Sequence, residues 1–455
     1  MRFFNIFFFV ILINALVYVE SAVADPLDKF MKPLPGAGEI MDLPGFYFVF
    51  PKDDTNELTI TWTDSCTFRY KLDGLLEDLL TSGGPVINYR HANKNAYYEI
   101  GWFLHDTEFL FVSGDRINQL DGDRNLLKVE TAFLIPMKNA ELTIGGRYSY
   151  HNLEISGKLP ILFKGVPGLG EDENSFLKWK ENEILVASHY RKGKDSVGLM
   201  LGFPLKNISL ESVSSNERAR LEFKPSGFKT GLSLSTEVDN DITGELYFAL
   251  GRLSGKNGVF RQDEQIGPMH TGINNRQWCI RLFDTAEYPD WMLSLIYEKS
   301  STGLQGSADL TQLANPIYGI ASPRAHLNAH YDISQTMLKF EKELGKFLNS
   351  DLSGSFGLTY WAMNGKLTTW ESLLFGSAII NENTEFLDVE SGLLFHLGFN
   401  ADWQLSQKDS IRFDISQSIP FNVKRQFDQP GGISQPHDRK WDGGRFISLS
   451  FVHSF

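Results

Sequence analysis

Apolar and polar residues alternate over most of the chain after about residue 57. Residues 445–455 (RFISLSFVHSF) show the pattern most clearly, and residues 142–150 (LTIGGRYSY) and 411–416 (IRFDIS) repeat it. A period of two indicates β-strands that have one apolar face and one polar face. No comparable helical period appears over most of the chain, so the pattern predicts an all-β fold.

The lengths of the alternating segments and of their connections favour a membrane barrel over a soluble sandwich. The segments run for about 9–14 residues, which fits a tilted strand that crosses a bilayer, whereas sandwich strands are commonly about 5–6 residues long. Short connections fall at 137–140, 192–194, 239–241, 286–289, 348–350 and 407–409, and long polar ones at 155–181, 254–274, 301–323, 365–390 and 422–442. Short turns at one rim and long loops at the other are typical of an up-and-down barrel in a membrane.

We therefore predict a transmembrane antiparallel up-and-down β-barrel over residues 57–455, with about 16 strands and a range of roughly 14–18. The candidate strands centre near residues 63, 100, 110, 131, 146, 187, 203, 228, 247, 280, 295, 336, 357, 398, 415 and 450. An even number places both ends of the barrel at the same rim. Residues 197–238 predict one long hairpin with its tip near residues 214–216.

The N-terminal part of the chain departs from this pattern. Residues 2–19 are mostly apolar, and Ala22-x-Ala24 follows them, which predicts a secretory signal peptide over residues 1–24 that is cleaved after Ala24. A retained membrane anchor is the alternative. Residues 25–56 are irregular, and we expect them in the periplasm or the lumen. Residues 72–80 (LDGLLEDLL) predict a short amphipathic helix on a loop or in the lumen.

Composition narrows the possible functions. The 455 residues carry a formal net charge of −13, which argues against nucleic-acid binding. Aromatic residues make up 13% of the chain, which argues against disorder. Apolar residues make up only 42%, and this average content is compatible with a membrane barrel because half of each strand faces away from lipid.

The C-terminus carries a resemblance to a known class of proteins. The last strand ends on Phe455, and Phe451 lies on the same strand face. Together with the leader and the alternating strands, this resembles bacterial outer-membrane β-barrels, in which such a strand is the assembly signal. His453 departs from that class, which usually has an aromatic or aliphatic residue there. Residues 391–455 are also similar in order to the ends of several substrate-channel families, from which we carry over no functional residues.

The resemblance implies where the protein lies and what it meets. It implies the outer membrane of a Gram-negative bacterium, reached by signal-peptide export. Its partners would then be outer-membrane lipid, the barrel assembly machinery and a small-molecule solute that the sequence does not identify. By analogy with porins, it also implies a homo-oligomer.

Charged residues on the polar strand faces are the candidates for lining a channel. They are Lys128, Glu130, Arg147, Arg281, Lys339, Glu341, Arg412 and Asp414. In a porin-sized barrel such residues line the water-filled lumen and set ion selectivity by their field. The alternative is that they are ordinary wall residues paired across strands.

Signals for enzymatic chemistry and for a disulfide are weak. His326 and His330 are four residues apart, but they fall where a loop meets a strand, and we expect no metal site there. No Gly-x-Ser-x-Gly motif is present. We predict no catalytic residue and no cofactor. Cys66 and Cys279 lie far apart in the expected strand order, so we expect two thiols, because a disulfide needs Cα atoms within about 7 Å.

These patterns favour an outer-membrane channel for the passive passage of small solutes. About 16 strands leave an aqueous lumen, whereas about 8 strands are filled by side chains. Three alternatives remain open: a transporter for hydrophobic compounds that residues 25–56 plug, a barrel enzyme acting on lipid or surface polymer, and a surface adhesin or assembly protein with binding loops.

Overall fold

The computed structural model describes residues 54–455, apart from short gaps between strands. The gaps are residues 73–74, 114–115, 159–173, 214–217, 240–241, 262–263, 285–290, 310–323, 348–349, 374–377 and 427–439. The predicted signal peptide and most of the predicted irregular segment therefore lie outside the described residues. Among the described residues, no helix has the length and apolar character needed to cross a membrane.

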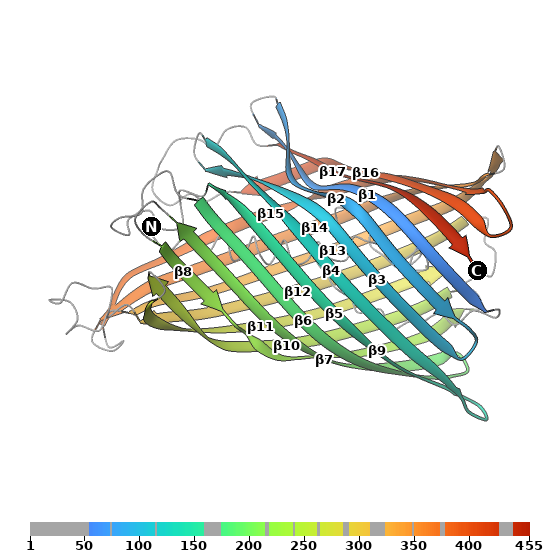
Figure 1. Cartoon of the computed structure of the whole chain (residues 1–455), viewed down its shortest axis with the longest axis horizontal. Helices are drawn as coiled ribbons and strands as arrows, with labels where there is room; N and C mark the ends of the chain where they lie inside the picture. The colour runs from blue at the N-terminus through green and yellow to red at the C-terminus, as the bar shows by residue number, and fades with distance from the viewer. Residues whose placement is uncertain are drawn as a thin grey trace.

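The described chain is almost entirely β-strand (Figure 1). The strands are β1 (Thr55–Leu72), β2 (Leu75–Ala92), β3 (Ala96–Ser113), β4 (Arg116–Pro136), β5 (Glu141–Lys158), β6 (Asn174–Lys192), β7 (Asp195–Val213), β8 (Arg218–Phe223), β9 (Ser226–Asp239), β10 (Ile242–Arg261), β11 (Glu264–Asp284), β12 (Trp291–Asp309), β13 (Arg324–Phe347), β14 (Ser350–Leu373), β15 (Ala378–Gln404), β16 (Asp409–Gln426) and β17 (Lys440–Ser454).

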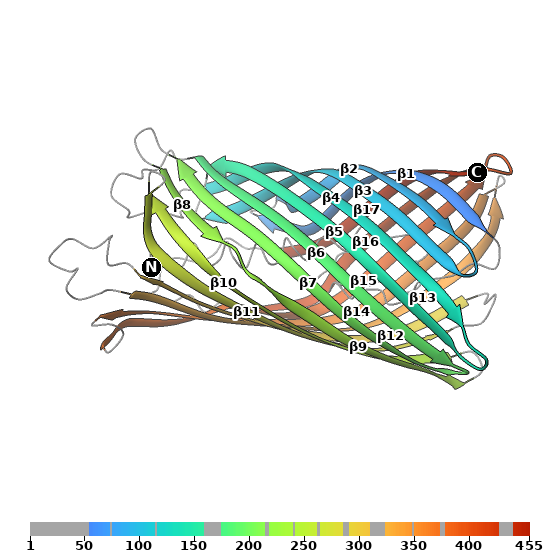
Figure 2. The same cartoon turned by 60° about the horizontal axis from the view of Figure 1, so that its bottom comes forward.

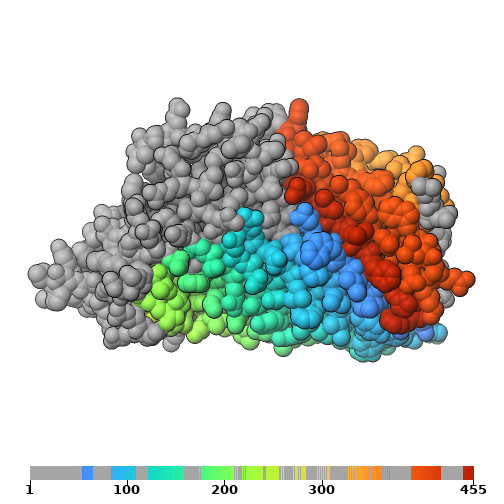
Figure 3. All heavy atoms as spheres, turned by 45° about the horizontal axis from the view of Figure 1, so that its top comes forward, coloured from blue at the N-terminus to red at the C-terminus, as the bar shows by residue number. Residues whose placement is uncertain are grey.

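The strand pairs of the described chain are antiparallel. Each strand pairs with its neighbours in sequence, except that β8 and β9 each pair with β7 and β10. Pairing also returns from the last strand to the first, with Glu57 of β1 opposite Ser454 of β17. Figures 1 and 2 show the strands running obliquely around the barrel axis, and Figure 3 shows the red last strand against the blue first strand. Because β8 and β9 both lie between β7 and β10, the seventeen described strands occupy sixteen positions.

The prediction of an all-β up-and-down barrel is confirmed. The predicted number of about 16 strands agrees with the sixteen strand positions, but only because two errors in the strand assignment cancel. The sequence pattern missed β2 and counted β3 twice, at residues 100 and 110. The helix predicted over residues 72–80 was wrong, because Leu75 and the residues after it pair with β1. Pairing with a neighbouring strand overrides a short local period, and the Gly83-Gly84-Pro85 run resembled a turn although it lies inside β2.

The two rims differ as predicted, although the second rim has fewer loops than expected. The predicted short connections all fall at the rim where β1 begins and β17 ends. At the other rim, the expected loops at 254–274 and 365–390 were largely wrong, since β10 runs to Arg261 and β14 runs to Leu373. Strands that extend beyond a lipid layer have water on both faces, so their sequences lose the apolar-polar alternation. The hairpin predicted over 197–238 is confirmed, with β7 as one arm and β8 and β9 as the other. Its predicted tip near 214–216 lies outside the described residues.

The outer face of the barrel is apolar and the inner face is mostly polar. On β3, for example, Tyr98, Ile100 and Trp102 are 42–49% exposed, whereas Tyr97 and Glu99 between them are buried. The same alternation places large exposed side chains on the outside of neighbouring strands. An apolar outer band is the surface that a barrel presents to lipid tails.

The C-terminal strand is held at both of its edges. The backbone N–H of Phe455 donates to the carbonyl of Asn56 at 2.9 Å, and that of Ser454 donates to Lys408 at 2.7 Å. His453 and Asp409 are hydrogen-bonded through Nδ1 and Oδ1 at 2.8 Å, and the His453 ring meets the Phe455 ring edge-on with centroids 4.7 Å apart. These contacts give His453 a structural role at a position where the resemblance favours an aromatic or aliphatic residue.

The strand order also separates the two cysteines. Cys66 lies on β1 and Cys279 on β11, seven pairings away around the shorter side of the ring. Cys279 is a buried thiol and is in no disulfide, as predicted, and it accepts a hydrogen bond from Nε of Arg281 at 3.3 Å. The side chain of Cys66 lies outside the described part of the chain.

Candidate functional site on the inner wall

The eight charged residues singled out from the sequence all lie on the inner face. Their strand neighbours show this, since Ile280 and Leu282 on either side of Arg281 are exposed on the outside, as is Leu338 beside Lys339. The side chains of Arg281 and Lys339 are only 10% and 12% exposed. Whether these residues line a solute path stays a prediction, but their placement on the inner face is a property of the fold.

Three of the eight residues join a continuous row of ion pairs, here called the charged ladder. It consists of Lys128, Glu130, Arg147, Glu183 and Lys229, from β4, β5, β6 and β9. Lys128 pairs with Glu130 at 3.1 Å, and Arg147 lies 3.9 Å from Glu130 and 4.0 Å from Glu183. Lys229 completes the row at 2.9 Å from Glu183. Cations and anions alternate along the row.

A glycine lets the charged ladder cross a strand. Glu183 is on β6 and Lys229 on β9, with β7 between them. Gly202 of β7 lies at the crossing, where an added Cβ would sit 3.1 Å from Oε1 of Glu183 and 3.5 Å from Cβ of Lys229. The missing side chain at Gly202 therefore leaves the space through which the lysine reaches the carboxylate.

A second group continues the polar wall next to the ladder. Nε1 of Trp179 donates to Glu181 at 3.3 Å, and Lys206 pairs with the same carboxylate at 2.8 Å. The Lys206 ammonium also lies 5.1 Å from the centroid of the Trp179 ring, within cation–π range. Further along, Nε of Arg124 donates to Nε2 of His151 at 3.3 Å.

The other five predicted residues do not join this row. Arg281 pairs with Glu245 at 3.9 Å, Lys339 with Glu341 at 3.1 Å, and Arg412 with Asp402 at 2.8 Å. Asp414 accepts hydrogen bonds from Asn400 and from Ser448, the latter at 3.2 Å. The structure thus divides the predicted set into one ladder and several separate pairs.

A different cluster on the inner face, here called the hydroxyl arc, spans β14–β16. It consists of Thr359, His396 and Ser418. His396 is 1% exposed, and its ring nitrogens bond to the hydroxyls of Ser418 at 2.9 Å and Thr359 at 3.1 Å. Apart from this cluster, the hydroxyls of Thr61 and Ser450 bond across the seam between β1 and β17 at 2.9 Å, where Ser450 lies opposite Arg412 of β16.

The hydroxyl arc does not have the arrangement of a hydrolase. Hydroxyls occupy both nitrogens of His396, whereas a nucleophile–base–acid site needs a carboxylate at one of them. His326 and His330 lie on β13, where Nε2 of His330 contacts Oδ2 of Asp332 at 3.1 Å. Among the residues that the structure describes, no group of three or more His, Cys, Asp or Glu side chains could hold a metal ion.

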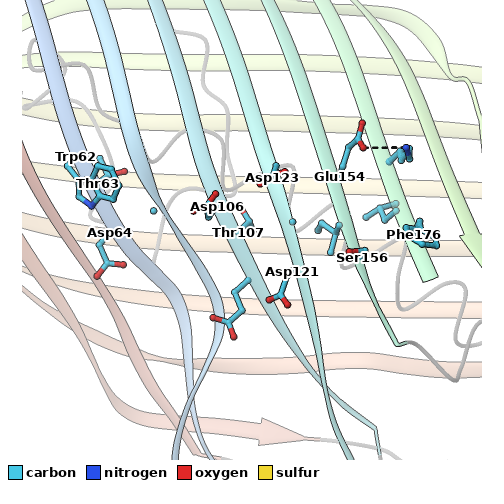
Figure 4. Close-up of a pocket in the computed structure, with 16 residues that line it drawn as sticks. Trp62, Thr63, Asp64, Asp106, Thr107, Asp121, Asp123, Glu154, Ser156 and Phe176 are labelled. Carbon is cyan, nitrogen blue, oxygen red and sulfur yellow. Dashed lines mark ion pairs between the residues drawn. The ribbon is translucent and has the colours of Figure 1, made fainter. Parts of the chain in front are cut away.

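Residues of β1–β6 line a cavity of about 880 Å³ (Figure 4). Its carboxylates come from β1, β3, β4 and β5, and they share the strand faces of exposed residues such as Trp62 and Ile100, so they lie on the outer side of the sheet and not on the inner wall. Glu154 pairs there with Lys178 at 3.3 Å. Gly84 borders this region with a φ of +153°, and an added Cβ would lie 2.1 Å from the carbonyl oxygen of Leu104. Only glycine fits that position, because any side chain would collide with the neighbouring backbone.

Sequence reasoning missed the charged residues of the inner wall on β6 and β7. Glu181, Glu183 and Lys206 were not among the candidates, although Trp179, Glu181 and Glu183 lie at every second position. The exposed Lys178 and Lys180 on the opposite face hid this signal, because charges then occur on both faces of the strand. A charge pattern identifies an inner face only where the outer face is apolar.

Comparisons with known proteins add little to this geometry. No protein family matches the chain, and no curated protein matches its sequence. Among solved structures, it is similar to the toluene transporter TodX of Pseudomonas putida (10% identity, 89% of each chain, TM-score 0.38) and TbuX of Ralstonia pickettii (10%, 89% of this chain and 90% of that one, 0.38). A Pseudomonas aeruginosa FadL homologue gives 11% identity, 94% and 99% coverage and a TM-score of 0.37. Values this low assign neither a family nor a substrate.

Proposed function

We propose that this protein is an outer-membrane channel through which small solutes pass passively. One observation carries the proposal: a ring of sixteen strand positions has an apolar outer band and ion-paired charges on its inner face. A ring of this size encloses more space than side chains of the wall fill, whereas a ring of about eight strands does not. Charges on the inner face favour a hydrated path over a dry core.

Reconstitution in planar bilayers tests the proposal directly. The full mature chain should give stepwise increases in conductance that scale with salt concentration, because ions follow the same water-filled path as small solutes. Liposome swelling with neutral solutes of increasing size would then give the size limit. Correctly folded protein that conducts nothing would reject an open channel.

An apolar cluster on the inner face supports a second candidate, a transporter for hydrophobic compounds. The cluster spans β6, β7, β10, β11 and β13, and its members are Leu185, Ala187, Met200, Tyr247, Ala249, Cys279 and Met337. Apolar side chains on an inner wall suit a solute with an apolar body.

The two candidates predict different effects of removing the segment before β1. If residues 25–56 act as a plug, deletion of residues 25–53, which leaves β1 intact, should raise the flux of a neutral aromatic probe such as benzyl alcohol into proteoliposomes. A flux equal to that of the full mature chain would reject the plug, and a flux equal to that of empty liposomes would reject transport of this probe.

A further inference from the structure

The members of the charged ladder differ in how far they are shielded. The side chains of Lys229 and Lys128 are 31% and 25% exposed, whereas Arg147 and Glu130 are each 14% exposed and Glu183 is 5% exposed. The two lysines stand at the ends of the row, and the most deeply buried charge is an acid. The part of the ladder that a solute can approach is therefore mainly ammonium.

The position of Glu183 points the same way. This carboxylate is shared between Arg147 and Lys229. In the adjacent pair, Lys206 and Glu181 lie 2.8 Å apart, so their opposite charges offset each other. Because a buried acid lies behind two cations, it weakens their field without presenting its own charge to the lumen.

Two pairs elsewhere on the inner wall have the opposite bias. The acid is the more exposed member in the pair of Lys339 and Glu341 (12% against 20%) and in the pair of Arg412 and Asp402 (21% against 29%). Asp414 adds a further carboxylate on β16. In the pair of Arg281 and Glu245 the cation is the more exposed member, but at 10% it is more deeply buried than either lysine of the ladder. Among these pairs, the ladder is thus where the cations are most accessible.

We propose that the charged ladder is a subsite for small anionic solutes of the carboxylate class. Lys229 and Lys128 contact the anion, and Glu183 sets how strongly they attract it. A carboxylate fits because each ammonium donates charge-assisted hydrogen bonds to its oxygens. The inference rests on the proposed channel function, and it deepens that function by naming the solute class and the residues that select it.

Reversal potentials in gradients of potassium chloride and potassium acetate test the proposal. Lys229→Gln should lower the anion-to-cation permeability ratio, and Glu183→Gln should raise it. Each change should be about two- to threefold at low salt, since a unit charge about 7 Å away in water contributes an energy near RT. Lys346→Gln is the control, because Lys346 lies at the turn rim with an 81% exposed side chain and pairs with Asp351; the ratio should not change.

The outcomes separate the inference from the function on which it rests. Conductance with an unchanged permeability ratio in both ladder variants overturns the subsite and leaves the channel standing. Absence of conductance in the wild-type protein overturns both. If Glu183→Gln does not fold, Lys128→Gln replaces it and should lower the ratio as Lys229→Gln does. A rise in either lysine variant overturns the proposal.

Discussion

The charged ladder and the hydroxyl arc occupy the same inner face of one sheet, yet they use different chemistry. The ladder joins long side chains whose lysines keep part of their surface accessible. The arc places short hydroxyls around the ring of His396, which is 1% exposed. Ion pairs with accessible ends can act on a passing solute, whereas a fully buried hydrogen-bonded cluster acts only on the wall.

The difference predicts two kinds of variant. Substitutions in the hydroxyl arc should lower stability and leave ion selectivity unchanged, because the arc carries no formal charge when His396 is neutral. Substitutions in the ladder should change both, since each removes a charge that also holds neighbouring strands together. Altered ion selectivity in a hydroxyl-arc variant, or unaltered selectivity in a ladder variant, would show that the two surfaces do not differ in this way.

The largest effect is expected at His396. His396→Ala removes a buried ring and leaves the hydroxyls of Thr359 and Ser418 without their nitrogen partner. The cavity and the lost hydrogen bonds together should lower the free energy of unfolding by about 2–4 kcal/mol. Urea unfolding in lipid vesicles, followed by tryptophan fluorescence, measures the change.

A milder substitution on the same ring provides the control for His396. Ser418→Ala removes one hydroxyl and keeps the ring, so it should cost about 1 kcal/mol. Equal losses in the two variants would mean that the imidazole does not organise the arc. The reversal potential of both variants should equal that of the wild-type protein, and a shift would assign the arc to the solute path.

An intermediate effect is expected for the ion pair between Glu183 and Lys229. A double-mutant cycle of Glu183→Gln and Lys229→Gln should give a coupling free energy of about 1–2 kcal/mol, because the carboxylate is buried and 2.9 Å from the ammonium. The matched cycle on Lys346 and Asp351, which are 81% and 70% exposed, should give at most a few tenths. Equal coupling free energies in the two cycles would show that burial does not strengthen the ion pair of the ladder.

The pattern of the sequence was sufficient for the fold but only partly for the site. Alternation identified fifteen of the sixteen strand positions because a strand between lipid and a polar inner face must change character at every residue. It failed at β2, where Gly83, Gly84 and Pro85 interrupt the pattern. It also failed where β10, β11, β14 and β15 extend into the expected loops at 254–274 and 365–390.

The inner site was harder to foresee because its partners come from several strands. Lys128, Glu130 and Arg147 were recognisable one strand at a time. Glu183 and Lys229 became part of the same row only through the pairing register and the open space at Gly202. The alternation of one strand holds no information on which residue of another strand will lie within 4 Å of it.

The smallest effect is expected at the seam between β17 and β1. Ser450→Ala breaks the 2.9 Å hydrogen bond to Thr61 between β17 and β1. Because Thr61 is only partly buried, its hydroxyl can bond to water instead, and the cost should stay near 0.5 kcal/mol. Thr61→Ser keeps the hydroxyl and serves as the control, with no loss beyond that of one methyl group. A loss of several kcal/mol in Ser450→Ala would show that side chains, and not the backbone pairing of β1 with β17, hold the seam closed. An altered reversal potential would show that the Thr61–Ser450 pair lies on the solute path.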